Sequence, residues 1–273
     1  MICLYRDIDE KEIVRLATEG KNVNEISKTL NYSKHVVVYR LNKLGISLDY
    51  YKSPFQKNFS SGEALTEIEK ANIESMAIGD GCLEKTGKDS ARLKIAHSIK
   101  QKDYLLWKYS LISKCVSKYP YESDVKLNDK VYGTIRFSTA SLPDIKKSYD
   151  IFYPNNKKIL PESIVSNITK LRLLIWFLDD GSAGIDNSRG NRRVSQWVIS
   201  SESFTEEENE MAKFYLLKNL NINAHIKKMS RNGKGFTNLG FSKSSGLYET
   251  LIDITPPYMT YKLTGVKAIT SEA

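Results

Sequence analysis

An acidic residue next to a glycine ends two apolar runs of this chain, one hundred residues apart, at 79–81 and 179–181. A glycine after an apolar helical run is the usual helix stop, so each run predicts a buried helix that ends by presenting a carboxylate, Asp80 or Asp180. The helix dipole makes that end partly negative, and a carboxylate there is unfavourable unless a cation lies beside it. Two such helix ends, packed together, predict a site for Mg²⁺ or a similar hard cation.

The segments that follow the two acids repeat in the same order. Each acid precedes an alternating, strand-like segment, then a helical stretch, then a hairpin-like region, and each half closes with a lysine. The lysines, Lys158 and Lys262, follow their aspartates by 78 and 82 positions. A single Asp-Gly pair is most simply a helix-ending turn, but two copies with matched lysines favour a functional pair. The repeated segments are 91–98, 103–116 and 124–138 in the first half, and 193–201, 205–220 and 223–241 in the second.

On these motifs, residues 64–273 resemble a single-chain LAGLIDADG homing endonuclease. They are similar to the branch whose second motif is like Trp176–Gly181 and whose C-terminal part is like Met259–Leu263. The resemblance covers about three quarters of the chain. It implies an α+β fold of two pseudo-symmetric αββαββα repeats, 64–160 and 161–273, each with a saddle-shaped antiparallel sheet that lies on DNA.

The chain departs from the family pattern where small residues normally let the two motif helices pack closely. We therefore expect this helix pair to be looser or shifted, with the metal-binding acids retained. The positions concerned are Glu74 and Ser75 in one helix, and Leu174 and Ile175 in the other.

The resemblance implies a metal-dependent double-strand break in a long asymmetric DNA site, because two non-identical repeats contact non-identical half-sites. Phosphodiester hydrolysis needs an activated water and stabilisation of the charge on phosphorus, which metal ions and lysines supply. Mg²⁺ is the expected ion; Mn²⁺ would substitute, and Ca²⁺ would bind without supporting cleavage. The implied site consists of Asp80 and Asp180 as metal ligands, the carbonyls of Gly79 and Asp179 as further ligands, and Lys158 and Lys262 near the scissile phosphates.

The alternating strands supply side chains for DNA contact. Residues two apart in a strand share a face, so one set points to the helices and the other to an open surface. Phosphate contacts would set the affinity and base-edge contacts the specificity. A single surface lysine is more often a solvated charge than a base contact, so the prediction concerns the group. The predicted DNA-contacting residues of the sheets are Arg92, Lys94, Ser98, Tyr132, Arg136, Arg193, Ser195, Trp197 and Lys227.

Composition agrees with a polyanionic partner. The 273 residues carry a formal charge of +9, an excess that favours nucleic acid but is shared by ribosomal and membrane-surface proteins. No window reaches the ~18 apolar residues that cross a bilayer, and the N-terminus lacks a signal-peptide pattern, so we expect an intracellular protein without a membrane partner. Cys3, Cys82 and Cys115 lack metal or redox spacing and are expected to be free thiols. The three histidines are scattered, which argues against a zinc site and against histidine-centred nuclease chemistry.

The first fifty residues form a separate predicted unit, an all-α helix-turn-helix domain over 1–50 whose third helix would contact DNA. A three-helix packing or dimerisation module is the alternative. A linker over 51–63, with Pro54, Gly62 and several serines, joins this unit to the repeats. The predicted helices are 10–18, 23–30 and 33–46, their core residues are Ile26, Leu30, Val37 and Leu41, and the DNA-contacting residues are Lys34, His35, Tyr39 and Arg40.

Two further functions are compatible with the same resemblance. One is a DNA-binding regulator built on an inactivated nuclease, against which the retention of Asp80 and Asp180 argues. The other is a maturase, a splicing cofactor that binds its host intron RNA, since some members of the family assist intron folding. The leading prediction is a monomeric endonuclease that acts on double-stranded DNA, with intron RNA as the partner under the maturase alternative.

Overall fold

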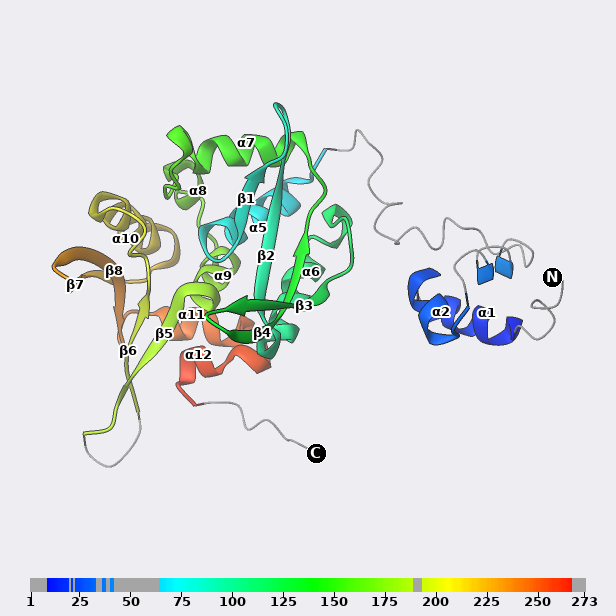
Figure 1. The fold of residues 1–273 in the computed structure, drawn as a ribbon. Coiled ribbons are helices and arrows are strands. Elements are labelled where there is room, and N and C mark those ends of the chain that lie inside the picture. The colour runs from blue at the N-terminus through cyan, green and yellow to red at the C-terminus, as the bar shows by residue number, and fades with distance from the viewer. Residues whose placement is uncertain are drawn as a thin grey trace. The chain divides into compact units, whose positions relative to one another are not determined.

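A computed structural model describes residues 9–19, 21, 23–32, 36–37, 40–41, 64–188 and 193–266. The chain divides into two compact units (Figure 1). One comprises Met1–Glu63 with Ser113–Tyr119, and the other comprises Ala64–Ile112 with Pro120–Ala273. The second unit carries both predicted repeats.

In the first unit, α1 (Glu10–Thr18) and α2 (Val23–Thr29) surround a small apolar core. The Asp9 side chain caps α1 by accepting a hydrogen bond from the backbone N–H of Glu12. Residues 36–37 and 40–41 are also helical, as expected for the third helix. The helices are therefore present, while their assignment as a helix-turn-helix stays a prediction. The buried core consists of Ile13, Leu16, Ala17, Ile26, Val37 and Leu41, with Val23, Leu30 and Tyr32 packed against it.

One of the four residues predicted to contact DNA in this unit can be placed. Arg40 pairs with Glu10 at 2.6 Å, and its side chain is only 14% exposed. It therefore lies against α1 and is already engaged, which corrects its prediction as a free DNA-contacting group. Lys34, His35 and Tyr39 lie outside the described residues.

The first repeat begins with a motif helix and continues into a four-stranded antiparallel sheet. Thr66 and Glu69 form the expected capping box at the start of the helix. The sheet order is β1-β2-β4-β3. In chain order the elements are α5 (Glu67–Ile78), β1 (Cys82–Lys85), β2 (Ala91–Ser98), α6 (Lys102–Leu111), β3 (Tyr121–Leu127), β4 (Lys130–Ser138) and α7 (Pro143–Phe152).

The second repeat has the same plan. A second capping box, Thr205 with Glu208, starts its long helix, and its sheet order, β5-β6-β8-β7, matches the first. The predicted α+β fold of two related repeats is confirmed. Its elements are α8 (Glu162–Val165), α9 (Lys170–Asp180), β5 (Gly181–Asp186), β6 (Arg193–Ile199), α10 (Glu206–Leu220), β7 (Ala224–Arg231), β8 (Lys234–Ser242), α11 (Leu247–Leu251) and α12 (Tyr261–Thr264).

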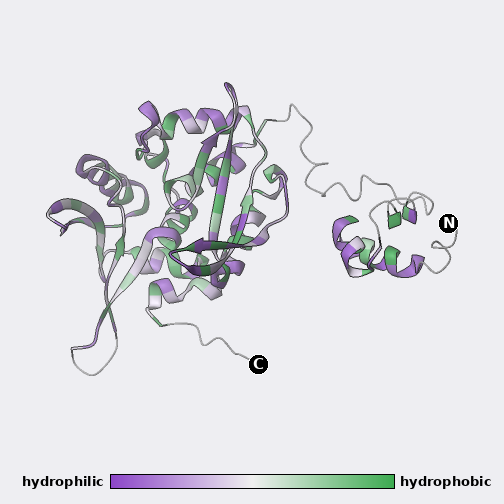
Figure 2. Cartoon of the chain, viewed as in Figure 1, coloured by the Kyte–Doolittle hydropathy of each residue, from purple (hydrophilic) through white to green (hydrophobic). Residues whose placement is uncertain are grey.

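Each sheet is covered by helices on one face and open on the other. In the first repeat α6 and α7 pack against β2, and in the second α10 packs against β7 and β8. Alternate residues point to opposite faces of a strand, and Figure 2 shows hydrophilic and hydrophobic residues following one another along the strands. The buried residues include Ile95 and Phe137 in the first sheet, and Leu239 and Phe241 in the second.

The two motif helices, α5 and α9, pack against each other at the centre of this unit. All four side chains that replace the family's small residues are buried. Leu174 and Ile175 extend the apolar core, whereas Glu74 pairs with Arg172 at 3.4 Å and accepts a hydrogen bond from Ser148 at 3.2 Å. The interface thus accommodates a charge by pairing it across the two repeats. Among the described residues, no helix has both the length and the apolar character to span a membrane.

Candidate active site at the paired helix ends

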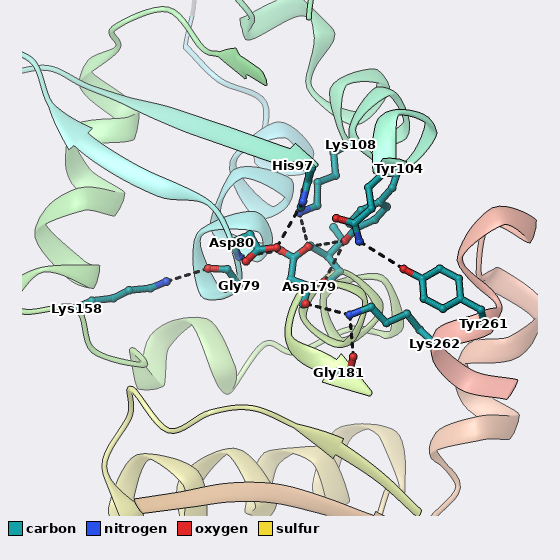
Figure 3. A network of polar contacts seen from close by, with 12 residues as sticks. Gly79, Asp80, His97, Tyr104, Lys108, Lys158, Asp179, Gly181, Tyr261 and Lys262 are labelled. Atoms are coloured by element: carbon teal, nitrogen blue, oxygen red, sulfur yellow. Dashed lines mark hydrogen bonds and ion pairs between the residues drawn. The ribbon is translucent and has the colours of Figure 1, made fainter. Parts of the chain in front are cut away.

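The C-terminal ends of α5 and α9 meet (Figure 3). The backbone N–H of Asp80 donates to Oδ2 of Asp179 across the interface at 3.0 Å. A Cβ on Gly79 would lie 2.4 Å from the same carboxylate oxygen, so only glycine allows this approach. The structure therefore brings the two acidic motifs together, one hundred residues apart in the chain.

The two ends differ in how they hold their acid. Asp180 is the last residue of α9, so its backbone belongs to the helix. The helix α5 stops at Ile78, and Asp80 lies in the turn that follows, with the next residue, Gly81, donating back to the Met76 carbonyl at 2.8 Å. The turn that holds Asp80 is therefore closed onto its own helix by Gly81, while the backbone N–H of Asp80 finds its acceptor in the other repeat.

Both predicted lysines contact these helix ends. Lys158 Nζ donates to the carbonyls of Ile78 and Gly79, each at 3.1 Å. Lys262 Nζ donates to the carbonyls of Asp179 at 3.3 Å and Gly181 at 2.9 Å. A cation that satisfies terminal carbonyls also offsets the negative end of the helix dipole. Burial lowers the pKa of both lysines, while the neighbouring carboxylates oppose this shift.

The acids at this site carry unfavourable negative charge. Burial, followed by the charges of Asp179 and Asp80, raises the pKa of Asp180 to about 7. Burial and the charge of Asp179 likewise raise the pKa of Asp80. Carboxylates kept close together and partly desolvated favour either a proton or a divalent cation with a preference for oxygen ligands. The donor set therefore fits a hard metal ion.

A buried polar cluster lies behind Asp80. The side chains of Lys108 and Asp179 are both 0% exposed, and their Nζ and Oδ1 atoms are 2.5 Å apart. The hydroxyl of Tyr104 donates to the same Oδ1 at 2.7 Å. Lys108 Nζ also lies 3.2 Å from Nε2 of His97, whose Nδ1 is 3.6 Å from Oδ2 of Asp80. Figure 3 shows these side chains converging on the junction of the helix ends.

The protonation of His97 follows from its neighbours. Burial and the charge of Lys108 lower the pKa of His97 to about 4, so its ring is neutral at neutral pH. A lysine ammonium has only donors, so Nε2 is the acceptor and the ring proton is on Nδ1, facing Asp80. Ligand atoms of Asp80, His97 and Asp179 lie within 4.8 Å of one another, but the ammonium of Lys108 already engages two of the three.

Sequence reasoning missed Tyr104, Lys108 and His97. The pattern did contain a signal: His97 continues the inward alternation of Leu93 and Ile95, and Lys108 falls among buried positions of a helix. Ionisable residues at apolar positions are rarely buried unless they are paired. They indicate a partner, but the sequence does not identify Asp179 as that partner, because it lies in the other repeat.

The predicted contact residues of the first sheet lie on its open face, and those on β2 alternate with buried neighbours. Arg92 and Lys94 both pair with Glu84 of β1, at 2.5 Å and 3.3 Å, which keeps the two cations side by side. These pairs are partly exposed and therefore weak. The predicted residues on this face are Arg92, Lys94 and Ser98 on β2, and Tyr132 and Arg136 on β4.

Trp197 lies on the helix side of the second sheet, which corrects its prediction as a DNA contact. The residue is 4% exposed. Its Nε1 donates to the Leu263 carbonyl at 2.7 Å, and its ring stacks on Tyr248. Trp197 therefore belongs to the core between β6 and the C-terminal helices.

A β-bulge explains why strict alternation fails on β6. The pairing of β5 with β6 shifts its register after Gly184, so β6 contains an extra residue at Ser195. A Cβ on Gly184 would lie 3.1 Å from Gln196 and 3.4 Å from Ser195, so these two neighbours share the open face. A Cβ on Gly265, just after α12, would lie 3.4 Å from Val194, which places Val194 on the helix side.

The remaining predicted residues of the second sheet are compatible with the open face. Beyond the bulge, Arg193 alternates with Val194 and pairs with Asp186 at 3.1 Å. Lys227 lies on the face of β7 opposite to Lys228, which reaches Glu206 of α10 at 2.7 Å. Arg193, Ser195 and Lys227 thus remain available to a ligand on the open surface.

Comparisons with known proteins identify the relatives of this chain. It is 27% identical over 195 residues to the protein RecA of Mycobacterium gastri, covering 68% of this chain and 44% of that protein. The chain thus spans less than half the length of this relative. It is 26% identical over 206 residues to a probable intron-encoded endonuclease 1 of Wickerhamomyces canadensis, covering 73% of this chain and 85% of that protein. Over 122 residues, 42% of this chain and 47% of the relative, it is 30% identical to the cytochrome b mRNA maturase bI2 of Debaryomyces hansenii.

A solved structure and a family model agree with these matches. The structure of the homing endonuclease I-WcaI bound to its DNA recognition sequence matches with a TM-score of 0.65 and 22% identity, covering 79% of this chain and 92% of that one. This likeness shows the fold. The model of the LAGLIDADG DNA endonuclease family matches residues 76–247, which is more than half of the chain and includes both acidic motifs. The chain belongs to the LAGLIDADG DNA endonuclease family.

Proposed function

We propose that this protein is a homing endonuclease that makes a metal-dependent double-strand break in a long, asymmetric DNA site. The observation that carries the proposal is the junction of the helix ends. Two acids with raised pKa values, Asp80 and Asp180, lie there beside Lys158 and Lys262, which bond to the terminal carbonyls. Two related but unequal sets of groups suit two phosphodiester bonds, one in each strand.

Asp80 and Asp180 would hold the metal ions, and the carbonyls of Gly79 and Asp179, each with a second lone pair beside its lysine bond, would add ligands. We expect Mg²⁺, with Mn²⁺ as a substitute and Ca²⁺ as a ligand that does not support cleavage. A bound divalent ion supplies an activated water and offsets charge on the phosphoryl group. Each lysine uses two of its three N–H donors on helix carbonyls and keeps one for a phosphate oxygen or the attacking water.

The open faces of the two sheets would bind the DNA. Each repeat would contact one half-site, and the site is asymmetric because the repeats present different side chains. Lysine and arginine contacts to phosphates would make binding weaken steeply with salt, since counterions are released. One chain carries both halves, so a monomer suffices. The proposed contacts are Arg92, Lys94, Ser98, Tyr132 and Arg136 in one repeat, and Arg193, Ser195 and Lys227 in the other.

For the N-terminal unit we propose a helix-turn-helix that extends the contact on one side of the nuclease site, with Lys34, His35 and Tyr39 on its third helix. A linker of about thirteen residues reaches at most ~44 Å. Deletion of 1–60 should shorten the DNA footprint on one side and weaken binding without moving the cut positions. An unchanged footprint would instead assign the unit to another partner or to a structural role.

The maturase relative supports a second candidate function, binding of a host intron RNA. The gene of such a protein would lie within an intron, in keeping with the name of the relative from Wickerhamomyces canadensis, a probable intron-encoded endonuclease. Binding of a structured intron RNA in moderate salt and without metal would distinguish this activity from cleavage of DNA.

The decisive experiment is cleavage of a randomised duplex library with Mg²⁺, followed by sequencing of the ends. We expect one long asymmetric site, cut in both strands with 3′ overhangs. Protein that binds duplex DNA but leaves the library uncut in Mg²⁺ and in Mn²⁺ would instead be a DNA-binding regulator on an inactivated nuclease fold.

A further inference from the structure

We propose that Lys108 and Asp179 are positioning residues that serve only the Asp80 half of the site and thereby set the balance of cleavage between the two DNA strands. The inference rests on the proposed endonuclease function. It concerns the buried side chains behind Asp80, of which those of Lys108 and Asp179 are 0% exposed. Asp179 meets Lys262 through its backbone carbonyl, whereas its carboxylate faces Lys108, Tyr104 and Asp80.

Asp80 lies beyond the end of its helix, so its backbone N–H finds its acceptor outside that helix. The backbone N–H of Asp80 is held by Oδ2 of Asp179, at 3.0 Å. Asp180 needs no such bond, because it is the last residue of α9 and its backbone is fixed by the helix itself. Movement of the Asp179 carboxylate would therefore displace one catalytic acid and leave the other in place.

Lys108 fixes the carboxylate that holds Asp80. Its ammonium bonds to Oδ1 of Asp179 at 2.5 Å, with both side chains fully buried. Tyr104 donates to the same oxygen, leaving Oδ2 to accept from Asp80. The ammonium also contacts His97, which lies beside the carboxylate of Asp80. The cluster therefore contacts Asp80 twice, at its backbone N–H through Asp179 and at its carboxylate through His97.

The second repeat has no counterpart of this cluster. Cys82 pairs with Lys94 in one sheet and Ser182 pairs with Val198 in the other, so Lys94 and Val198 are equivalent. The helices α6 and α10 both begin eight positions later, at Lys102 and Glu206.

Counting along these helices, the seventh residue is Lys108 in α6 and Ala212 in α10, and both are 0% exposed. The counterparts of His97 and Asp179 are Ser201 and Gly79. The first repeat thus contributes the lysine and the second contributes the aspartate, and no reciprocal pair exists at the equivalent positions, all of which the structure describes.

A buried ion pair can also be purely structural, and the same interface provides a matched control. Glu74 and Arg172 pair across α5 and α9 with side chains only 7% exposed, but both lie away from the C-terminal helix ends that carry Asp80 and Asp180. Breaking either pair leaves an unpaired buried charge, so both partners should be replaced together. Loss of the Glu74 pair should lower the stability of the protein without changing the ratio of the cleavage rates of the two DNA strands.

The test uses the full-length protein and the DNA site found by the library experiment. Lys108→Met with Asp179→Ala removes the charges and the acceptor for the Asp80 N–H. Lys108→Met with Asp179→Asn removes the same charges but keeps an acceptor oxygen. Glu74→Gln with Arg172→Met is the control. Each strand is labelled separately to measure its cleavage rate, and amide exchange is measured by NMR in metal-free protein at a temperature where all variants are folded.

In the variant without the acceptor, we expect the rate ratio of the two strands to change by about tenfold or more, since small misplacements of catalytic groups have large effects. Nicked DNA should accumulate. The Asp80 amide should exchange about tenfold faster or more, and the Asp180 amide at an unchanged rate. The variant that keeps the acceptor should retain a strand ratio close to that of the wild type, and so should the control.

Equal slowing of both strands, or an Asp80 amide that exchanges as in the wild type, would overturn the positioning role. Failure of the wild type to cut any duplex would overturn the proposed function instead. In that case the exchange measurement still decides whether Asp179 holds Asp80.

Discussion

The two repeats present the same kinds of group at their helix ends, an acid and a lysine, but hold them by different contacts. Each has an acid at the end of a motif helix and a lysine on the terminal carbonyls of that helix. Asp180 is held by its own helix, whereas Asp80 is held from the other repeat through Asp179. After a duplication, the chemistry constrains the reactive groups, but the residues behind them can diverge as long as they hold the same positions. The unequal supports suggest unequal roles for the two halves.

The largest expected effect compares the two acids. Asp80→Asn and Asp180→Asn each keep the shape of the side chain but remove the charge that holds a divalent ion. We expect each to slow double-strand cleavage by about a thousandfold, with the larger loss in the strand that its own half cuts, measured in single-turnover assays with Mg²⁺. Binding of DNA in Ca²⁺ should persist in both. Full activity in both single variants would exclude these acids as the metal ligands.

The next effect compares Trp197 with Leu93, its equivalent in the first sheet. The two positions are equivalent because Ala183 pairs with Trp197 in the second sheet as Leu83 pairs with Leu93 in the first. Both are buried on the helix side. Trp197→Ala should lower the free energy of unfolding by about 3–5 kcal/mol, and Leu93→Ala by about 2–5 kcal/mol. Gln196→Ala, on the open face, should instead weaken DNA binding with little loss of stability. Denaturant unfolding and binding assays on the three variants separate the two faces; an unchanged stability in Trp197→Ala would contradict the core assignment.

Much of this architecture is predictable from the sequence because it depends on local patterns of residue types. A glycine after an apolar run is a common helix stop, so the acids near the ends of α5 and α9 can be predicted from the sequence alone. The matched distances from each acid to Lys158 and Lys262 predict the duplication and the lysine positions. Alternation also identifies the open face of the first sheet.

The features that the sequence did not reveal depend on distant contacts. The β-bulge at Ser195 inserts one residue into β6, so counting by twos groups Trp197 with residues that face the other way. Lys108 and Asp179 are 71 positions apart and lie in different repeats. Arg40 looks free in the sequence but pairs with Glu10, 30 positions earlier. Such pairings become visible only when the chain is folded.

A smaller effect compares the two lysines. Lys158→Met and Lys262→Met keep much of the side-chain length but remove the ammonium that bonds to the helix end. We expect cleavage at saturating DNA to slow by about tenfold to a hundredfold, with a smaller loss of affinity. If the halves act on separate strands, each variant should slow one strand more than the other. Unchanged rates in both variants would remove the lysines from the mechanism.

The smallest expected effect concerns stability against pH and compares Asp180 with Asp80. The pKa of Asp180 is raised from its ordinary value of 3.8 to about 7. Between these values the folded protein holds a proton that the unfolded chain has released, so the free energy of unfolding falls as the pH rises from about 4 to 7. Asp180→Asn removes the titrating carboxyl group and therefore removes this decrease in the free energy of unfolding. In EDTA it should therefore raise the Tm at pH 8 by a few degrees over the wild type, and the difference should vanish near pH 4.

Asp80→Asn should change the Tm in the same direction, because the pKa of Asp80 is also raised. Added Mg²⁺ should reverse the order, since an ion that binds only the folded protein stabilises the wild type by mass action and the variants lack a ligand for it. Thermal unfolding of the three proteins, scanned from pH 4 to 8 with and without Mg²⁺, measures both effects. A Tm of Asp180→Asn that stays below the wild type at every pH without metal would show that the Asp180 carboxylate stabilises the fold, contrary to the charge repulsion inferred at the paired helix ends.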